Sequence, residues 1–336
     1  MRFKISSVFI SNLYLKKHWI AVLVVLFLSL VLNIIGLTNY IYTKTVMQNE
    51  QSFQAQKSKY PLLATRVLLE NPVDVLVSFL SLRNNLKNEL APWGDSFGMY
   101  FEYLPTGTSI NINGLNEFHA ASLFKTPVIM AYYRTRERLN KKDDPTVALK
   151  PQDIDSQFGD LWKKGVGYKL KLSEAVRLAL EESDNTAAKV IVPYVGSIDF
   201  QAVYQGLDID LNVDKEGAIL TAKSYSSIFK ALYFSSVLSK DSSQTILDFL
   251  THSKFPDKIE AGVPDNIVVA HKIGDFVDKE GNEAFTDCGI VYVPRRPYLL
   301  CMVSKTDEQT ARERMQDVSK MIYDYVSSIN TPLRLD

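Results

Sequence analysis

Cysteine and histidine are scarce in this chain of 336 residues. It has two cysteines, Cys288 and Cys301, and four histidines that lie far apart in the sequence. Two cysteines are too few for a disulfide framework, and no Cys-x-x-Cys or Cys/His spacing indicates a metal site. A glycine-rich nucleotide loop is also missing, so we expect no metal and no other cofactor. The cysteines fall on neighbouring predicted strands in a diagonal register, which favours buried free thiols over a disulfide.

An excess of charge of one sign is absent as well. Lys and Arg together number 38, and so do Asp and Glu. This balance gives no argument for nucleic acid or another polyanionic partner. Hydrophobic residues make up 46% of the chain, which is enough for a sizeable core in one or two domains. We expect the protein to be a monomer.

One long hydrophobic run lies near the N-terminus. Residues 19–43 contain no charged side chain, and a run of this length can cross a membrane as one helix. The basic residues that precede it are Arg2, Lys4, Lys16 and Lys17. Because basic flanks stay in the cytoplasm and no acid comes before Glu50, we expect the N-terminus inside and the remainder of the chain outside.

This run divides the chain into four expected parts. They are a cytoplasmic basic tail over 1–18, a single-pass transmembrane signal anchor over 19–43, a stalk over 44–72 and an extracytoplasmic domain over 73–331. A cleaved signal peptide is the alternative to an anchor. Its apolar core is normally shorter, and no Ala-x-Ala-like cleavage site follows the run here.

Beyond residue 72 the apolar pattern is that of a folded domain. Residues 73–90 have helical spacing, and the runs 98–104 and 108–113 predict a hairpin. A mostly helical segment then extends from Ser122 to about Leu250. Three further strands and a last helix are expected at 266–274, 284–293, 297–305 and 311–329. This order predicts one antiparallel sheet built from both ends of the chain, with a helical subdomain inserted.

The first candidate site residues open the helical segment. Ser122 and Lys125 are three residues apart, so they lie one turn from each other on one helix face. A desolvated amine can act as the base for a serine hydroxyl, which is otherwise a poor nucleophile. The spacing alone is weak, because Ser227 and Lys230 share it. Pro127, just inside the helix start, favours the first pair.

Two further motifs follow in the chain. Ser183-Asp184-Asn185 comes after an apolar helical run and is either a helix cap or a source of catalytic side chains, and the two roles are compatible. Lys272-Ile273-Gly274 follows the strand-like residues 268–270. A cation there would attract an anionic substrate, and a glycine would let the substrate backbone approach closely. His271 should point to the other face of this strand, in a structural role.

The order of these three motifs resembles that of the class A β-lactamases and related penicillin-binding proteins. The resemblance covers roughly residues 73 to 331. It implies an α/β (α+β) fold of the β-lactamase/transpeptidase type, with an antiparallel five-stranded sheet, helices packed on it and an inserted all-helical subdomain. It also implies a bacterial serine hydrolase, held at the cell membrane, that opens β-lactam amides or peptidoglycan peptides through an acyl-enzyme.

The same resemblance implies a role for each motif residue. Ser122 would be acylated, Lys125 would be its base partner and Ser183 would pass the proton. The backbone N–H groups of Ser122 and Asp275 would form the oxyanion hole. The residues expected to bind substrate are Asn185, Lys272, Gly274 and Asp275.

Two departures from the family pattern limit what the resemblance implies. Ile273 stands where the family usually has Thr or Ser, so a hydroxyl expected to bind the substrate carboxylate is lost, and Asp275 adds negative charge at the same edge. The family's Glu-x-x-Leu-Asn motif, whose Glu activates the deacylating water, is also absent. Glu216 is the nearest candidate for that base. It shares a segment with Asp208, Asp210 and Asp214 that also reads as a solvated loop.

Three functions therefore stay open at this point. The first is a β-lactamase-like hydrolase acting on β-lactam amides. The second is a D,D-peptidase (carboxypeptidase or transpeptidase) acting on cell-wall peptides, which the missing Glu motif fits at least as well. The third is a non-catalytic relative that binds such ligands, which Ile273 and Asp275 favour.

Overall fold

The computed structural model describes residues 23–24, 26–45, 47–48, 78–215 and 217–329. The chain divides into two units, Met1–Val75 and Leu76–Asp336. In the first unit, Leu26–Thr45 forms a helix with an 18-residue stretch of mean hydropathy 1.5, and no residue of that stretch is buried. Its length and composition suit a membrane span or a signal sequence. The expected tail at 1–18 and most of the expected 44–72 stalk lie outside the described residues.

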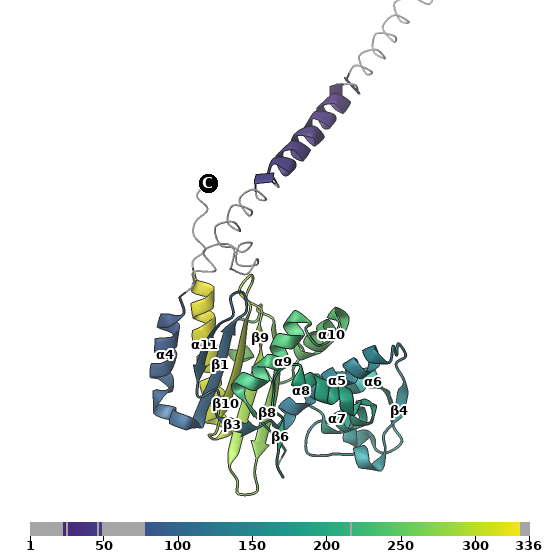
Figure 1. Ribbon diagram of the computed structural model, residues 1–336, viewed down its shortest axis with the longest axis vertical. Coiled ribbons are helices and arrows are strands. Elements are labelled where there is room, and N and C mark those ends of the chain that lie inside the picture. Colours follow the sequence, from purple (N-terminus) through teal and green to yellow (C-terminus); the bar gives the residue numbers. More distant parts are fainter. Residues whose placement is uncertain (1–22, 25, 46, 49–77, 216, 330–336) are drawn as a thin grey trace, which may run out of the picture. The chain divides into compact units, whose positions relative to one another are not determined.

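The second unit is built on a five-stranded sheet in the order β2-β1-β10-β9-β8 (Figure 1). Every neighbouring pair is antiparallel. The strands are β1 Phe97–Tyr103, β2 Thr108–Ile112, β8 Val269–Val277, β9 Glu283–Val291 and β10 Tyr298–Ser304. The predicted five-stranded sheet from both ends of the chain is therefore confirmed, and β8 is one of its edges.

Helices cover both faces of this sheet (Figure 1). One face carries α4 Leu80–Leu90 and α11 Glu308–Ser328, and the other carries the inserted helical subdomain. Because strand side chains alternate, Leu300 and Met302 pack into the hydrophobic core beneath α4 and α11, whereas Leu299 and Val303 pack into the core beneath the helical subdomain. Burial on both faces explains why these strands are apolar runs rather than alternating ones.

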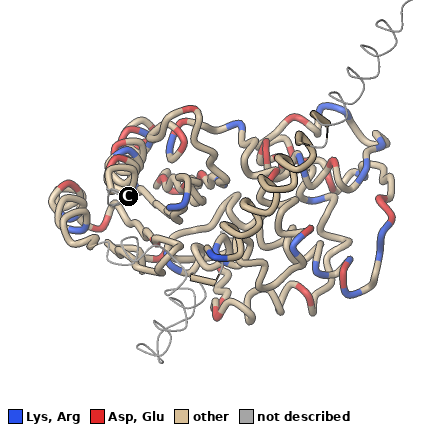
Figure 2. Tube along the Cα trace, turned by 90° about the horizontal axis from the view of Figure 1, so that it is seen from above, with Lys and Arg blue, Asp and Glu red and all other residues tan. Residues whose placement is uncertain are grey.

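The helical subdomain follows β2 and precedes β8, as predicted. Its α-helices are α5 Lys125–Arg138, α6 Leu172–Glu181, α7 Asn185–Ile191, α8 Ser197–Gln205, α9 Ala222–Phe234 and α10 Lys240–Leu250. Short 3₁₀ helices are η1 Ala91–Ser96, η2 Ala121–Phe124, η3 Pro151–Asp153, η4 Leu161–Lys164, η5 Val192–Tyr194 and η6 Glu260–Gly262. Acidic and basic residues are interspersed along the trace (Figure 2).

Two small sheets lie outside what the periodicity predicts. In the first, β7 Ala218–Thr221 pairs with both β3 Glu117–His119 and β6 Asn212–Val213. In the second, β4 Thr146–Ala148 pairs with β5 Lys169–Lys171. Strands of two to four residues are too short to show an alternating pattern, so the sequence offers little signal for them.

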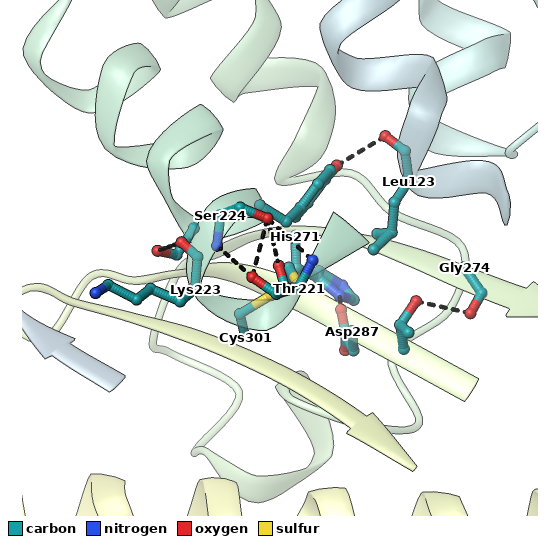
Figure 3. The surroundings of a disulfide bond; sticks show 12 residues. Leu123, Thr221, Lys223, Ser224, His271, Gly274, Asp287 and Cys301 are labelled. Carbon is teal, nitrogen blue, oxygen red and sulfur yellow. Dashed lines mark hydrogen bonds and ion pairs between the residues drawn. A yellow bond between two sulfur atoms is a disulfide. The ribbon is translucent and has the colours of Figure 1, made fainter. Parts of the chain in front are cut away.

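The two cysteines correct one prediction. Cys288 on β9 lies directly opposite Cys301 on β10, with their Cα atoms 4.0 Å apart, and the two form a disulfide (Figure 3). The expectation of free thiols was wrong because the register is direct rather than diagonal. The disulfide is fully buried on the face that carries the helical subdomain, the same face as Lys272.

Candidate active site

Ser122 lies on η2, the 3₁₀ turn that leads directly into α5. Ala121 precedes it with φ of 43°, a left-handed backbone conformation that costs a residue with a Cβ some energy. Lys125 is the first residue of α5, and its Nζ lies 3.0 Å from Ser122 Oγ. The sequence spacing therefore does bring the hydroxyl and the amine together.

The Lys125 amine is buried among polar partners. Its side chain donates to the carbonyl oxygen of Ser183, to Ser183 Oγ at 3.2 Å and to Asn185 Oδ1 at 2.7 Å. Burial lowers the pKa of Lys125 to about 7, although the charges of Asp184 and Asp155 act in the opposite direction. A substantial fraction of this amine is therefore neutral near pH 7 and able to accept a proton.

Ser183 lies between two amines. It is fully buried in the short link between α6 and α7, with φ of 56°. Besides Lys125, it receives a hydrogen bond from Lys272 Nζ, at 2.7 Å from Ser183 Oγ. A hydroxyl placed in this way can receive a proton from one amine and pass its own onward.

The neighbouring Asp184 caps the N-terminus of α7, which is the structural role that the sequence also allowed for this motif. Its carboxylate accepts from the backbone N–H of Ala187, three residues into α7, at 2.8 Å. It also accepts from Leu161 N at 2.8 Å, which ties a distant loop to the motif. Asp184 thus fixes the backbone that carries Ser183 and Asn185.

Asn185 contacts a residue that the sequence did not single out. Its Oδ1 accepts from Lys125, while its Nδ2 donates to Asp155 Oδ1 at 3.2 Å. Burial acts to raise the pKa of Asp155, but hydrogen bonds led by that from Lys189 outweigh it and lower the pKa. An isolated Asp in a long loop has no spacing that could reveal this partnership.

Lys272 on β8 faces the helical subdomain and is 1% exposed. Besides Ser183 Oγ, its Nζ donates to Ile273 O at 3.2 Å. Burial and then the charge of Lys125 lower the pKa of Lys272 well below its ordinary value. A lowered pKa reduces the positive charge that was expected to attract an anionic substrate. The hydrogen bond from Lys272 Nζ to Ser183 Oγ favours a role for Lys272 beside Ser183 instead.

Gly274 allows β8 to approach the backbone around η2, which carries the candidate nucleophile Ser122; residues 120–124 are hereafter the nucleophile turn. A Cβ at this position would lie 2.8 Å from the carbonyl oxygen of Ala120 and 2.7 Å from Thr286 Oγ1. From the sequence, this glycine was expected to let the substrate backbone approach closely. The structure adds a second reason, because the protein's own backbone beside Ser122 occupies the space of a side chain.

The opposite face of β8 carries His271, Ile273 and Asp275. His271 is fully buried, and its Nδ1 lies 2.8 Å from Asp287 Oδ1, so its predicted position away from Lys272 is confirmed (Figure 3). Ile273 is 2% exposed. Asp275 lies 3.4 Å from the buried ammonium of Lys258, so its charge has a partner on this face.

The backbone N–H of Asp275 points off the free edge of the sheet. Tyr292 N donates to Val268 O, so residues 268, 270, 272 and 274 turn their peptide groups toward β9. The alternate residues, including Asp275, turn theirs away from β9. With β8 at the sheet edge and Gly274 against the nucleophile turn, this N–H is available to an oxyanion beside Ser122.

Residues 206–217, between α8 and β7, form a short connection. Glu216 lies outside the described residues. Asp208, Asp210 and Asp214 are exposed, as expected for a solvated loop. Asp214 nevertheless has a specific partner, because His119 Nε2 lies 3.0 Å from its carboxylate.

The second Ser-x-x-Lys spacing is an ordinary helix. Ser227 and Lys230 lie within α9, and Lys230 Nζ pairs with Glu102 at 2.5 Å. Among the residues that the structure describes, no group of three or more His, Cys, Asp or Glu side chains is placed to hold a metal ion.

Comparison with known proteins places the chain in a family. Residues 81–326 match the model of the beta-lactamase enzyme family, and the chain therefore belongs to that family. It is 25% identical over 291 residues to a beta-lactamase of Bacteroides uniformis, which covers 76% of this chain and 90% of that protein. The resemblance drawn from the three motifs, and the serine-hydrolase class that it implies, are confirmed.

Solved structures share the fold. A mutant of PBP-A, in an acyl-enzyme complex with penicillin G, has a TM-score of 0.66 and 21% identity, covering 74% of this chain and 97% of that one. The TLA-3 extended-spectrum beta-lactamase has a TM-score of 0.68 and 19% identity, covering 74% of this chain and 99% of that one. The predicted β-lactamase/transpeptidase-like fold is thereby confirmed.

Proposed function

We propose that this protein opens the amide bond of β-lactams through an acyl-enzyme on Ser122. One observation carries the proposal: Ser122 Oγ, Lys125 Nζ, Ser183 Oγ and Lys272 Nζ form one continuous chain of contacts of 3.2 Å or less. Family membership supports the same reaction. A hydroxyl, a base of lowered pKa and a second hydroxyl are the groups that acyl transfer requires.

In the proposed acylation, neutral Lys125 accepts the proton of the Ser122 hydroxyl as Oγ bonds to the lactam carbonyl carbon. The electron pair of the C=O bond moves to oxygen, and the N–H groups of Ser122 and Asp275 would stabilise this oxyanion. When the carbonyl reforms, the C–N bond breaks. Ser183 then gives its proton to the leaving nitrogen and takes one from Lys125, which restores the neutral amine.

Asn185 and Gly274 would set the substrate in place. Asn185 Nδ2 is held in the site by Asp155, and an amide N–H there can meet a carbonyl of the substrate. Gly274 keeps the free edge of β8 close to the nucleophile turn. A substrate lying along that edge would present its carbonyl carbon to Ser122.

A D,D-peptidase acting on cell-wall peptides is a second candidate, and the segment at 206–217 favours it. The Glu-x-x-Leu-Asn motif is absent from the sequence, and the described acids within this segment are exposed. Without a base for the deacylating water, a β-lactam would acylate Ser122 and leave slowly. Glu216 is the remaining candidate for that base.

Intact-mass measurement of the full chain in detergent, with penicillin G, tests these proposals. We expect a covalent adduct of one penicillin that is lost in Ser122→Ala and kept in Ser227→Ala, the matched control from the second Ser-x-x-Lys. Rapid return to the free mass supports the β-lactamase, and an adduct lasting hours supports the peptidase. If the natural chain and Ser122→Ala both stay unmodified and the penicillin is not consumed, the chain is a non-catalytic relative.

We also propose that the N-terminal helix is a retained anchor that holds the catalytic domain on the outer face of a bacterial membrane. The apolar run has four basic residues before it and no cleavage motif after it. The described helix Leu26–Thr45 is long enough to span the hydrocarbon core. A monomer remains our expectation for the oligomeric state.

A further inference from the structure

His119 is held by two contacts that the catalytic mechanism does not use. Its ring stacks on that of Phe276, with centroids 4.4 Å apart and planes at 19°. Its Nε2 lies 3.1 Å from Asp214 Oδ1 and 3.0 Å from Oδ2. These three residues come from β3, from β8 and from the turn between β6 and β7, which are distant in the sequence.

The three segments meet around the nucleophile turn. His119 is three residues before Ser122, with only Ala120 and Ala121 between them. Both backbone polar groups of Ala120 are hydrogen-bonded, because its N–H donates to Ala218 O and its carbonyl accepts from Leu123 N. Ala121 has the unfavourable φ of 43°, and such a backbone persists only where its surroundings hold it.

Phe276 connects the same contact to the proposed oxyanion hole. It lies two residues beyond Gly274, on the same face of β8. Asp275, whose N–H points off the sheet edge, stands between them. The His119–Phe276 stack therefore ties the strand that carries this N–H to the strand that leads into Ser122.

We propose that His119 and Asp214 are positioning residues that fix the distance between the Ser122 turn and the Asp275 N–H. Asp214 orients the imidazole, and the imidazole packs against Phe276. This inference rests on the proposed acyl-enzyme function, since it assigns these residues a role in forming the oxyanion hole. Loss of the contact would slow the chemical step more than it would weaken substrate binding, because the oxyanion exists only after attack begins.

The variants are chosen to separate positioning from folding. His119→Ala removes both contacts, and Asp214→Asn keeps a hydrogen-bond acceptor without the charge. His119→Tyr keeps an aromatic ring for Phe276 and a polar tip for Asp214, and a cavity of about 490 Å³ beside His119 leaves room for the larger ring. His252→Ala is the matched control, since His252 is exposed and its ring nitrogen lies within hydrogen-bond distance of Asp248 O and Thr251 Oγ1, at the end of its own helix.

Penicillin G acylation of the full chain would be followed at increasing penicillin concentration, which separates the limiting acylation rate from the apparent dissociation constant. We expect His119→Ala to lower the limiting rate by about tenfold or more with the dissociation constant little changed. Asp214→Asn should have a smaller effect in the same direction. His119→Tyr should restore most of the rate, and His252→Ala should match the natural chain. Equal limiting rates in all four variants would overturn the inference.

Hydrogen exchange of the same proteins gives a readout that does not depend on acylation. We expect faster exchange in His119→Ala at residues 119–126 and 270–277, with the rest of the domain unchanged. If the natural chain is never acylated, the proposed function fails and exchange alone decides the positioning role. Unchanged exchange in these two segments would then overturn it.

Discussion

Lys125 shows how burial turns an ordinary side chain into a candidate base. An exposed lysine is almost fully protonated at pH 7, and a cation cannot take a proton from Ser122. Here the side chain is 9% exposed, and its described partners are the oxygens of neutral side chains and a carbonyl. Burial therefore lowers its pKa to about 7.

This shift predicts the pH dependence of acylation. The neutral amine is the active form, so the rate should fall about tenfold per pH unit below 7 and level off above it. We expect Lys125→Ala to reduce the rate by a factor of about 10² or more. Stopped-flow acylation by penicillin G between pH 5 and 10 measures both effects, with Lys230→Ala as control. An inflection near 10, the ordinary value for lysine, would contradict the role of burial.

Gly274 gives a second prediction for a single residue. In Gly274→Ala, the new Cβ would lie within 2.8 Å of the carbonyl oxygen of Ala120, so the strand or the nucleophile turn must shift. We expect acylation to slow by about tenfold or more, since small displacements at a reacting centre are costly. Val277→Ala is on the same strand, 59% exposed, and should acylate at the natural rate. Equal rates for both variants would show that the turn accommodates a methyl group.

At the scale of elements, apolar periodicity predicts most of the strands and helices that carry the site. It does not predict the register in which the strands pair. The expected hairpin, three C-terminal strands and last helix all form. The direct pairing of Cys288 with Cys301 was missed, because register depends on how the β9–β10 turn closes. The short strand β3 was missed too, although it leads into Ser122 and carries His119.

The β9–β10 disulfide predicts a measurable contribution to stability. It closes a loop with a sequence separation of 13 residues, and a crosslink of that span typically stabilises by about 3 kcal/mol. Denaturant unfolding of the natural chain should therefore show a higher free energy than that of the double variant Cys288→Ala, Cys301→Ala. A reducing agent should lower the stability of the first and leave the second unchanged. Two titratable thiols in the unreduced, denatured chain would contradict the bond.

For the whole molecule, the proposed anchor and the disulfide indicate the same compartment. Disulfides persist in oxidising environments outside the cytoplasm, and the proposed topology places the catalytic domain there. The two observations are independent, since one comes from the N-terminal sequence and the other from the pairing of β9 with β10. The cell-wall peptides of the second candidate function are also found outside the cytoplasm.

The proposed anchor predicts where the chain is found in cells. We expect the full chain to sediment with membranes and to resist carbonate extraction, because a spanning helix inserts almost irreversibly. Protease added to spheroplasts should remove the catalytic domain. A chain that begins at Leu76 should stay soluble, since that unit starts there. Cleavage after the apolar run, seen by N-terminal sequencing, would favour the signal-peptide alternative.

The sequence by itself determined the main strands and helices of the domain, and it singled out the candidate residues of the site. Ser122, Lys125, Ser183, Asn185 and Lys272 could be named because they stand in three short motifs whose order along the chain resembles that of the family. Only the tertiary structure decided their chemistry. The lowered pKa of Lys125, the place of Ser183 between two amines, the free N–H of Asp275 and the contact of His119 with Phe276 depend on desolvation and register. Both arise when segments far apart in the sequence pack together.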